Sequence, residues 1–532
     1  MAVSLTPVDE VVDTSQFTCG ITRLADQARC MKERTVPALR LTVINDIPPK
    51  NAEDYVLYWM TSARRLQWNF SLQRAVEWAV TLKKPLVILE ALRCDYQWAS
   101  DRLHAFIIQG MQINAAACAE HGVTYLPYIE PQLGAGRGLL SALAKNACVV
   151  VGDDYPAFFL RRMITAAATQ VPCRFETVDG NGLLPLRASE KACPTAYVFR
   201  RWLQKKLPIH LDDFPQPFPL KKLPRLVAPS LPSAWGKRWK AASDLSGTAT
   251  SLRTLPIDHS VLIAALPGGT TAAQAQMKLF LRQRLARYHE DRNVVDNPAA
   301  SGLSPWLHMG HLSAHEVCAQ VFKLEGWGPE KLAAKATGIR EGWWGLSPAA
   351  EAFFDELITW REVGYHYCHH RPAHDTYDDL PTWAQQSLEI HADDPRAYMY
   401  SLAHFTKAQT HDTLWNAAQR ELVQTGMMHN YLRMLWGKKI IEWTRHPREA
   451  FAIMTELNNR FALDGRDPNS SSGISWCFGR FDRPWMTRPI FGTIRYMTSA
   501  STMNKIKLKN YLQRYGDDAQ TSGIQNQLDF AP

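Results

Sequence analysis

The chain reads His429-Asn430-Tyr431-Leu432-Arg433-Met434-Leu435-Trp436-Gly437-Lys438-Lys439-Ile440-Ile441-Glu442-Trp443 and, after one further helix, Leu463-Asp464-Gly465-Arg466-Asp467-Pro468-Asn469. The first stretch predicts one helix on which Trp436 and Trp443 share a face, ~10 Å apart along the axis. Such an aromatic pair is by itself typical of core packing. The arginine and methionine just ahead of Trp436, and the Asp-rich loop that follows, mark this region as the candidate site.

Helical periodicity extends outward from this stretch. It predicts helices over 274–288, over 413–424 with a stop at Gly426, and over 447–461 with Pro447 in the first turn. Strand signals are nearly absent beyond residue 257. We therefore expect residues 257–532 to form an all-helical domain.

Residues 37–202 show a different pattern. Short apolar runs at 55–59, 85–89, 123–126 and 148–151 alternate with longer amphipathic stretches. This alternation predicts a doubly wound, Rossmann-like α/β domain with a parallel sheet, because strands buried on both faces are continuously apolar. Residues 1–36 are expected to be an irregular extension. Residues 203–256, rich in Pro and Lys, are expected to be a linker.

Composition and charge exclude only a few classes of protein. The 532 residues carry a net charge of +9, which weakly favours a polyanionic partner such as nucleic acid. Ten cysteines include no CxxC pair, so neither a zinc site nor an iron–sulfur cluster is indicated, and a reducing cytosol is expected. No signal peptide and no apolar run of ~18 residues is found. The 18 tryptophans suggest stacking surfaces or electron relays in addition to core packing.

A second candidate site lies in the segment Asn297–Gly310, where Ser301, Gly302 and Ser304 precede Pro305. Small hydroxyl residues and a glycine ahead of a helix offer backbone N–H groups to an anion. Taken alone, this is a common way to begin a helix.

These motifs together resemble the photolyase/cryptochrome family, and most closely the class II cyclobutane-pyrimidine-dimer photolyases. The likeness is strongest from about residue 274 to 500. It implies an N-terminal antenna domain, a helical FAD domain, and a second chromophore that in this family is a deazaflavin or a folate. The residues that it implies as FAD contacts are Tyr288, Ser301, Gly302, Leu303, Ser304, Arg433, Asn458, Asp464 and Asp467.

The resemblance also implies an electron relay to the flavin. Trp436 would be nearest the cofactor, Trp415 intermediate, and Trp443 at the surface.

For the lesion side, the resemblance implies the catalytic residues Glu362, Asn458, Met434 and Trp476, and the DNA contacts Arg483, Trp485, Arg495, Lys505 and Lys507. Glu362 is expected to hydrogen-bond a flipped-out dimer, and Trp476 to form one aromatic wall of its pocket. The segment after Glu362 departs from the class II pattern, so the second wall is open between Tyr365 and His366.

The expected function is light-dependent DNA repair, in which excited reduced FAD gives an electron to a cyclobutane pyrimidine dimer. The expected partner is double-stranded DNA containing such dimers, and the protein is expected to be a cytoplasmic monomer, nucleoid-associated if prokaryotic, without a membrane. Two alternatives stay open. One is a cryptochrome-like blue-light receptor with the same flavin and relay, and the other is a flavin-dependent DNA-binding module without catalysis.

Overall fold

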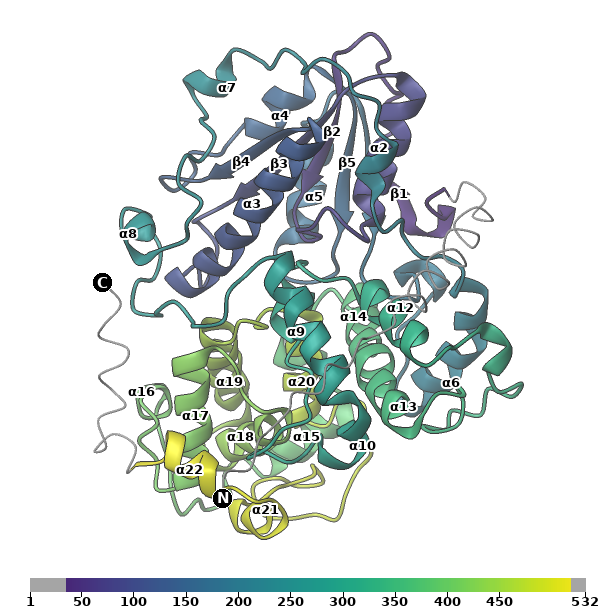
Figure 1. The fold of residues 1–532 in the computed structure, drawn as a ribbon. Coiled ribbons are helices and arrows are strands. Elements are labelled where there is room, and N and C mark those ends of the chain that lie inside the picture. Colours follow the sequence, from purple (N-terminus) through teal and green to yellow (C-terminus); the bar gives the residue numbers. More distant parts are fainter. Residues whose placement is uncertain (1–34, 518–532) are drawn as a thin grey trace, which may run out of the picture.

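The computed structural model describes residues 35–517, so almost all of the predicted extension 1–36 lies outside the described residues. A six-stranded α/β unit stands at one end of the molecule and a helical unit at the other (Figure 1). The N-terminal unit is the predicted mostly parallel sheet, and the region that follows it is largely helical, as expected. Among the described residues, no helix is both long and apolar enough to span a membrane.

The sheet has the order β1-β6-β5-β2-β3-β4, and only its edge pair β1–β6 is antiparallel. The apolar runs predicted β2 to β5. They gave no signal for β1, which is short and partly exposed, or for β6, which carries charged residues. The strands are β1 (Leu41–Val43), β2 (Tyr55–Met60), β3 (Leu86–Leu92), β4 (Thr124–Ile129), β5 (Ala147–Asp154) and β6 (Arg174–Asp179).

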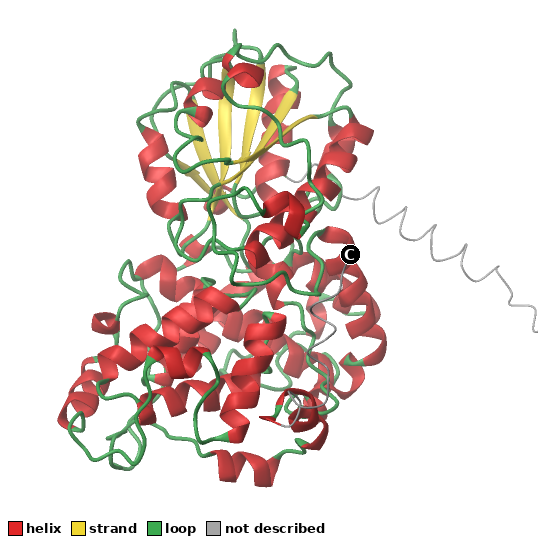
Figure 2. Ribbon diagram, turned by 90° about the vertical axis from the view of Figure 1, so that its left-hand side faces the viewer, coloured by secondary structure: helices red, strands yellow, loops and turns green. Residues whose placement is uncertain are grey.

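Strand β2 shows why the sheet is doubly wound. All six of its residues are buried, and alternate side chains point to opposite faces. Val56, Tyr58 and Met60 pack in the cluster that contains α2 (Phe70–Leu82). The intervening residues pack against α4 (Leu139–Ala144) and α5 (Leu160–Ala168). Figure 2 shows the sheet enclosed between helices on both sides.

The segment 203–256, expected to be a linker, returns to the sheet. Leu220 is buried in the cluster on the α2 face, and Trp239 is buried in the cluster on the opposite face. The Trp239 indole donates a hydrogen bond to the carbonyl of Ala135 at 2.9 Å. The segment contains only short helices, α7 (Ala234–Lys237) and α8 (Ala249–Leu252) among them, and follows the end of α6 (Ala196–Lys206).

The helical unit contains two apolar clusters and packs against the sheet through α3 (Asp101–His121). Arg102 of α3 is buried and donates to the carbonyls of Val423 and Phe461, near the carboxyl ends of two helices. Carbonyls in the last turn of a helix generally have no partner within it, so the guanidinium provides hydrogen-bond donors for them. Its positive charge also interacts favourably with the negative end of the helix dipole.

The helices that follow α8 include those predicted around 274–288, 413–424, 429–444 and 447–461. They are α9 (Thr270–Gln283), α10 (Tyr288–Asp291), α11 (Ser304–His308), α12 (Ala314–Leu324), α13 (Pro348–Phe354), the π-helical turn η7 (Asp355–Trp360), α14 (Arg361–His370), α15 (Thr382–Ile390), α16 (Leu402–Thr406), α17 (Thr413–Thr425), α18 (Asn430–Trp443), α19 (Pro447–Phe461), α20 (Pro468–Cys477), α21 (Ser499–Lys505) and α22 (Lys509–Tyr515).

Candidate functional site

A cavity of about 1660 Å³ opens in the helical unit, and most of the predicted site residues line it. It is large enough for a dinucleotide together with part of a second ligand. Of the predicted residues, those that line the cavity are Tyr288, Ser301, Gly302, Leu303, Ser304, Arg433, Met434, Trp436, Asn458, Asp464, Asp467, Trp476, Arg483 and Arg495. Glu362, Trp415, Trp443, Trp485, Lys505 and Lys507 do not line it.

One end of the cavity is formed by the loop before α11. Gly302 has φ +67°, a conformation that favours glycine. The side-chain amide of Gln276 holds this loop by donating to the carbonyl of Ser301 at 2.7 Å. The hydroxyl of Ser304 lines the cavity with no hydrogen bond to another described residue. This end therefore presents hydroxyl groups beside an open backbone turn, which suits a phosphorylated ligand.

Elsewhere in the cavity, an arginine–aspartate pair joins α18 to the loop after α19. Both terminal nitrogens of Arg433 lie 3.1 Å from Oδ1 of Asp464. Asn458 is buried nearby on α19, and its amide donates to Asn459 at 3.1 Å. A ring system that gains negative charge needs such donors at its edge. The donor set of this cavity thus fits FAD, with hydroxyls for the diphosphate and an amide and a guanidinium for the isoalloxazine.

Three tryptophans form a chain of ring contacts that leads away from the cavity, the first contact stacked and the second edge-on. Trp436 lines the cavity, and its ring lies 6.5 Å from that of Trp415 with an angle of 4° between the planes. The Trp415 and Trp443 centroids are 6.1 Å apart. The structure brings the three predicted relay residues together in the predicted order. The expectation that Trp443 lies at the surface is wrong, because its side chain is only 2% exposed.

Glu362 does not reach the cavity. Its two carboxylate oxygens accept the backbone N–H groups of Leu183 and Leu184 at 2.7 and 3.0 Å, and the side chain is buried. Among the described residues, two glutamates line the cavity, Glu421 of α17 and Glu356. Glu356 lies six residues before Glu362 in the π-helical turn η7, where it pairs with Arg292 at 2.7 Å. Six positions advance a helix of this kind by about one and a half turns, so the two carboxyl groups lie on different faces.

The aromatic residue that lines the cavity beside Trp476 is Trp360, and neither Tyr365 nor His366 reaches it. Trp360 and Trp476 line the cavity and stack on each other, with centroids 4.6 Å apart and planes inclined by 14°. Tyr365 and His366 are buried on α14 away from the cavity. Glu356 and Trp360 are four residues apart, a spacing that predicts a shared helix face but does not show that this face lines the cavity.

The close approach of α14 to α20 positions Trp476. A Cβ atom on Gly364 would lie 2.7 Å from Oδ1 of Asn469 and 2.9 Å from Oγ of Ser472. A larger residue here would force the side chains of Asn469 and Ser472 to move, so glycine allows the close approach of the two helices.

Asp467 holds the loop that joins the cavity to the α/β unit. Its carboxylate accepts hydrogen bonds from the hydroxyls of Tyr155 and Tyr365, and Oδ2 lies 3.1 Å from Nδ1 of His308. Burial alone would raise the pKa of this carboxyl, but the hydrogen bond from His308 and the charge of Arg361 outweigh it and hold the pKa well below its usual range. Asp467 is thus an ionised anchor between the two units.

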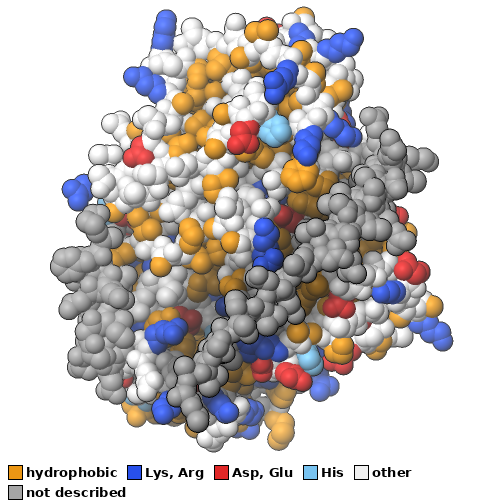
Figure 3. Space-filling model, in the orientation of Figure 1, with side chains coloured by type: hydrophobic (Ala, Val, Ile, Leu, Met, Phe, Trp, Pro, Cys, Tyr) orange, Lys and Arg blue, Asp and Glu red, His pale blue; other side chains and the backbone are white. Residues whose placement is uncertain are grey.

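An irregular loop projects beside the mouth of the cavity. Arg483 and Arg495 line the cavity and are exposed, and Arg495 lies over the Trp485 ring at 5.3 Å. Trp485 and Met486 are 46% and 86% exposed. Lys505 and Lys507 are exposed next along the chain. On the face shown in Figure 3, by contrast, Lys and Arg side chains are scattered among apolar and uncharged atoms.

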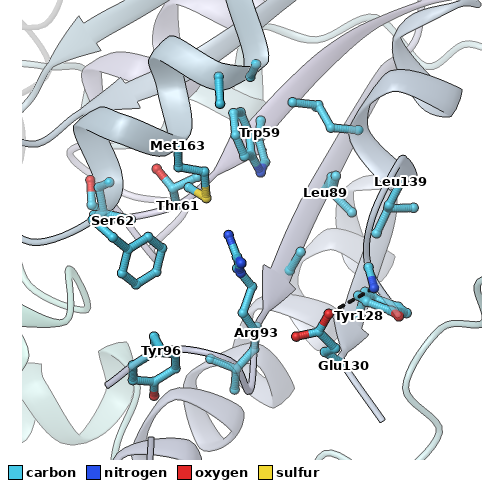
Figure 4. A pocket seen from close by; sticks show the side chains of 18 of the residues that line it. Trp59, Thr61, Ser62, Leu89, Arg93, Tyr96, Tyr128, Glu130, Leu139 and Met163 are labelled. Atoms are coloured by element: carbon cyan, nitrogen blue, oxygen red, sulfur yellow. Dashed lines mark hydrogen bonds between the residues drawn. The ribbon is translucent and has the colours of Figure 1, made fainter. Parts of the chain in front are cut away.

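A smaller cavity of about 320 Å³ lies at the carboxyl ends of β2, β3 and β4. Its wall is mostly apolar, with Trp59, Leu89 and Leu139 on one side (Figure 4). Arg93 extends into the open space, and Glu130 is held on the rim by the backbone N–H of Gly136 at 2.9 Å (Figure 4). Ligands of open α/β sheets bind at this edge. Nowhere in residues 35–517 do three or more His, Cys, Asp or Glu side chains gather as a metal site.

Comparison with known proteins shows which family the chain belongs to. No family model matches it. Proteins named deoxyribodipyrimidine photo-lyase are similar over most of its length. The one from Methanothermobacter thermautotrophicus is 32% identical and covers 90% of this chain and 98% of its own, and the one from Arabidopsis thaliana is 31% identical and covers 86% and 88%. The chain belongs to the photolyase/cryptochrome family, and these relatives are class II cyclobutane-pyrimidine-dimer photolyases.

Solved structures support the fold. A class III photolyase from Agrobacterium tumefaciens superposes with a TM-score of 0.60 at 17% identity and covers 87% of this chain and 86% of its own. A cryptochrome from Synechocystis gives 0.58 at 18% identity, covering 88% and 89%. At this identity the likeness shows the shared architecture alone, and does not separate repair from signalling.

The burial of the Glu362 carboxyl can be tested through the pH dependence of the protein's stability. Burial raises its pKa to about 7 from 4.5, against the hydrogen bonds from Leu184 and Leu183 and the charge of Arg361. The folded state therefore binds this proton more tightly than the unfolded chain, and its contribution to stability is lost as the pH rises from 4.5 through 7. We expect the unfolding free energy of the parent to fall relative to that of Glu362→Gln as the pH rises over this range. The relative loss should be on the order of 3 kcal/mol and should then level off.

The measurement is urea denaturation of both proteins at several pH values. A difference that does not change between pH 4.5 and 7 would contradict the burial of an acid at this position.

Proposed function

We propose that this protein is a DNA photolyase that repairs cyclobutane pyrimidine dimers with FAD and light. When bound, reduced FAD excited by light supplies one electron to the dimer, whose cyclobutane ring then opens before the electron returns. The observation that carries the proposal is a single cavity that combines the donor set for FAD with a paired-tryptophan wall and a flanking basic loop. A receptor without repair would not need the last two features.

The lesion end of the cavity suits a dimer of two pyrimidines. The Trp360–Trp476 pair offers flat apolar surface to bases that have left the duplex stack. Glu356 and Met434 line the same cavity. Burial raises the pKa of Glu356, and Asp355 adds to this, while Arg292 lowers it. The net shift of the pKa is upward, toward the protonated form, and it is in that form that the carboxyl can donate a hydrogen bond to a pyrimidine carbonyl as negative charge develops there.

The smaller cavity at the sheet edge is proposed as the site of a second, light-harvesting chromophore, a deazaflavin or a folate. Its mostly apolar wall suits a flat ring, and Arg93 and Arg137 on its lining suit an anionic tail.

The decisive experiment is repair of a dimer-containing oligonucleotide under blue light. Restored pyrimidine absorbance in the light, and none in the dark, would support the proposal. Flavin that responds to light without any loss of dimers would favour the receptor alternative.

FAD is expected to copurify with the chain in a 1:1 ratio. Asp464→Ala leaves Arg433 without its carboxylate partner and is expected to weaken FAD binding about 10- to 100-fold, since a hydrogen bond to a charged group contributes ~1.5–3 kcal/mol. The measurement is flavin absorbance after gel filtration, followed by titration of apoprotein with FAD. Asp258→Ala is the matched control, because it breaks an Arg460–Asp258 pair of 2.9 Å that does not line this cavity. Equal flavin loss in both variants would contradict the assignment of the Arg433–Asp464 pair to FAD binding.

DNA binding is expected to weaken steeply with salt. Each neutralised phosphate contributes a slope of about −0.9 in log K against log salt concentration on duplex DNA, so Arg495→Ala should make the slope shallower by about 0.9. The control is Lys240→Ala, an exposed lysine on the segment that packs against the sheet. Fluorescence anisotropy of a labelled duplex at several salt concentrations gives both slopes. If Arg495→Ala and Lys240→Ala change the slope equally, the loop after α20 is not the DNA-binding surface.

A further inference from the structure

The tryptophan relay ends inside the protein. Trp443, its last member, is only 2% exposed. A hole that arrives there would sit on an indole without access to water, and Nζ of Lys439 lies 5.2 Å from its ring centroid. Lys439 is in turn paired with Glu442 at 2.7 Å, so this pair adds no net negative charge that would stabilise a hole on the ring. The relay therefore needs a further donor between Trp443 and the solvent.

Tyr400 and His411 occupy that place. The Tyr400 ring meets the Trp443 ring edge-on, with centroids 5.8 Å apart, and the His411 ring lies 4.9 Å from it. The backbone N–H of Tyr400 donates to the carbonyl of Trp443 at 3.0 Å, which fixes the segment against the end of α18. Tyr400 is half-buried, and His411 is exposed.

The tyrosine is arranged to lose a proton together with an electron. Its hydroxyl oxygen accepts the backbone N–H of His411 at 2.9 Å, and the hydroxyl lies 2.9 Å from Nδ1 of the same residue. With the ring proton on Nε2, Nδ1 accepts the phenolic hydrogen. Oxidation of a phenol beside a base gives a neutral radical and moves the positive charge onto the base, which here is open to water.

We propose that Tyr400 is the terminal electron donor of the relay and that His411 is its proton acceptor. Oxidised Trp443 takes one electron from Tyr400, and the phenolic proton moves to Nδ1 of His411. The products are neutral Trp443, a neutral Tyr400 radical and a His411 imidazolium. A soluble thiolate later gives one electron to the Tyr400 radical and becomes a thiyl radical, and the phenolic proton returns to Tyr400 from His411. The inference rests on the proposed function, because light-driven electron uptake at the cavity creates the hole.

Tyr398 provides a matched control. It stacks on His411 with centroids 3.6 Å apart and is 48% exposed. Its hydroxyl makes no hydrogen bond with any described residue, so it has no base to take its proton. Tyr398→Phe should keep the stacked ring and leave the donor pair intact.

The test is flash illumination of the FAD-loaded protein with detection by electron paramagnetic resonance and transient absorption. The parent and Tyr398→Phe should both form a neutral tyrosyl radical as the tryptophanyl signal decays. Tyr400→Phe should lose the tyrosyl signal, and its charge-separated state should decay faster by about tenfold. His411→Gln should lower the tyrosyl yield. Flavin content and thermal melting confirm that each variant is folded.

A tyrosyl radical that persists in Tyr400→Phe, or a parent that forms only tryptophanyl radicals, would overturn the inference. Failure of the proposed function looks different. In that case the protein would bind no FAD, or Trp436→Phe would leave every radical signal unchanged.

Discussion

Replacing Glu356 by alanine is expected to lower the repair yield per absorbed photon by about tenfold, which corresponds to ~1.4 kcal/mol in the competition between ring opening and charge return. The reason is that a carboxyl aimed at a pyrimidine carbonyl stabilises that carbonyl more once it gains negative charge. A group that binds the charged state more strongly than the ground state acts on rate and not on binding. Lesion affinity should therefore change much less than the yield.

Three variants separate donation from other roles of Glu356. Glu356→Ala removes the donor, Glu356→Gln keeps an N–H donor and should retain part of the yield, and Glu362→Gln alters the neighbouring buried glutamate that does not line the cavity. Quantum yield and lesion affinity are measured on each folded protein. If Glu356→Ala loses affinity while the yield per bound lesion is unchanged, Glu356 only binds the lesion. If Glu362→Gln alone loses yield, the assignment of the carboxyl to Glu356 is wrong.

Trp436→Phe is expected to slow the light-driven reduction of bound oxidised FAD by about a hundredfold, equivalent to ~2.7 kcal/mol. Of the three tryptophans Trp436, Trp415 and Trp443, only Trp436 lines the cavity. Its ring faces that of Trp415 in nearly parallel planes. A phenyl ring at this position is smaller and much harder to oxidise, so the electron would have to pass from Trp415 to the flavin in one longer step. Repair by protein that has been reduced chemically should be spared, because that reaction does not use the relay.

The matched control is Trp343→Phe, which alters an equally buried tryptophan that does not line the cavity. Trp436→Phe also removes a hydrogen bond of 2.8 Å to Gln419 and should cost ~1–3 kcal/mol of stability, so melting curves accompany the kinetics. Photoreduction at the parental rate in Trp436→Phe would mean that another path carries the electron.

Local patterns predicted much of the architecture. The continuous apolar runs identified β2 to β5 because strands buried on both faces tolerate few polar residues. The edge strand β1 and the charged strand β6 gave no such signal. Glu176 of β6 is nevertheless buried, because Arg74 and the Trp78 indole, from α2, satisfy its carboxylate. That compensation comes from a helix a hundred residues earlier and cannot be read from the strand itself.

Helical and strand periodicity and short motifs were enough to predict the fold class, the family and a set of site residues most of which line the cavity, because each depends on residues that lie close together in the sequence. Tertiary packing was needed to show that Glu356 and not Glu362 lines the cavity and that Trp443 is buried. The π-helical turn η7 changes the angle between successive side chains, so spacing alone could not choose between Glu356 and Glu362. Trp443 is covered by the segment from Tyr398 to His411, and burial by a distant segment is a property of packing that no local pattern encodes.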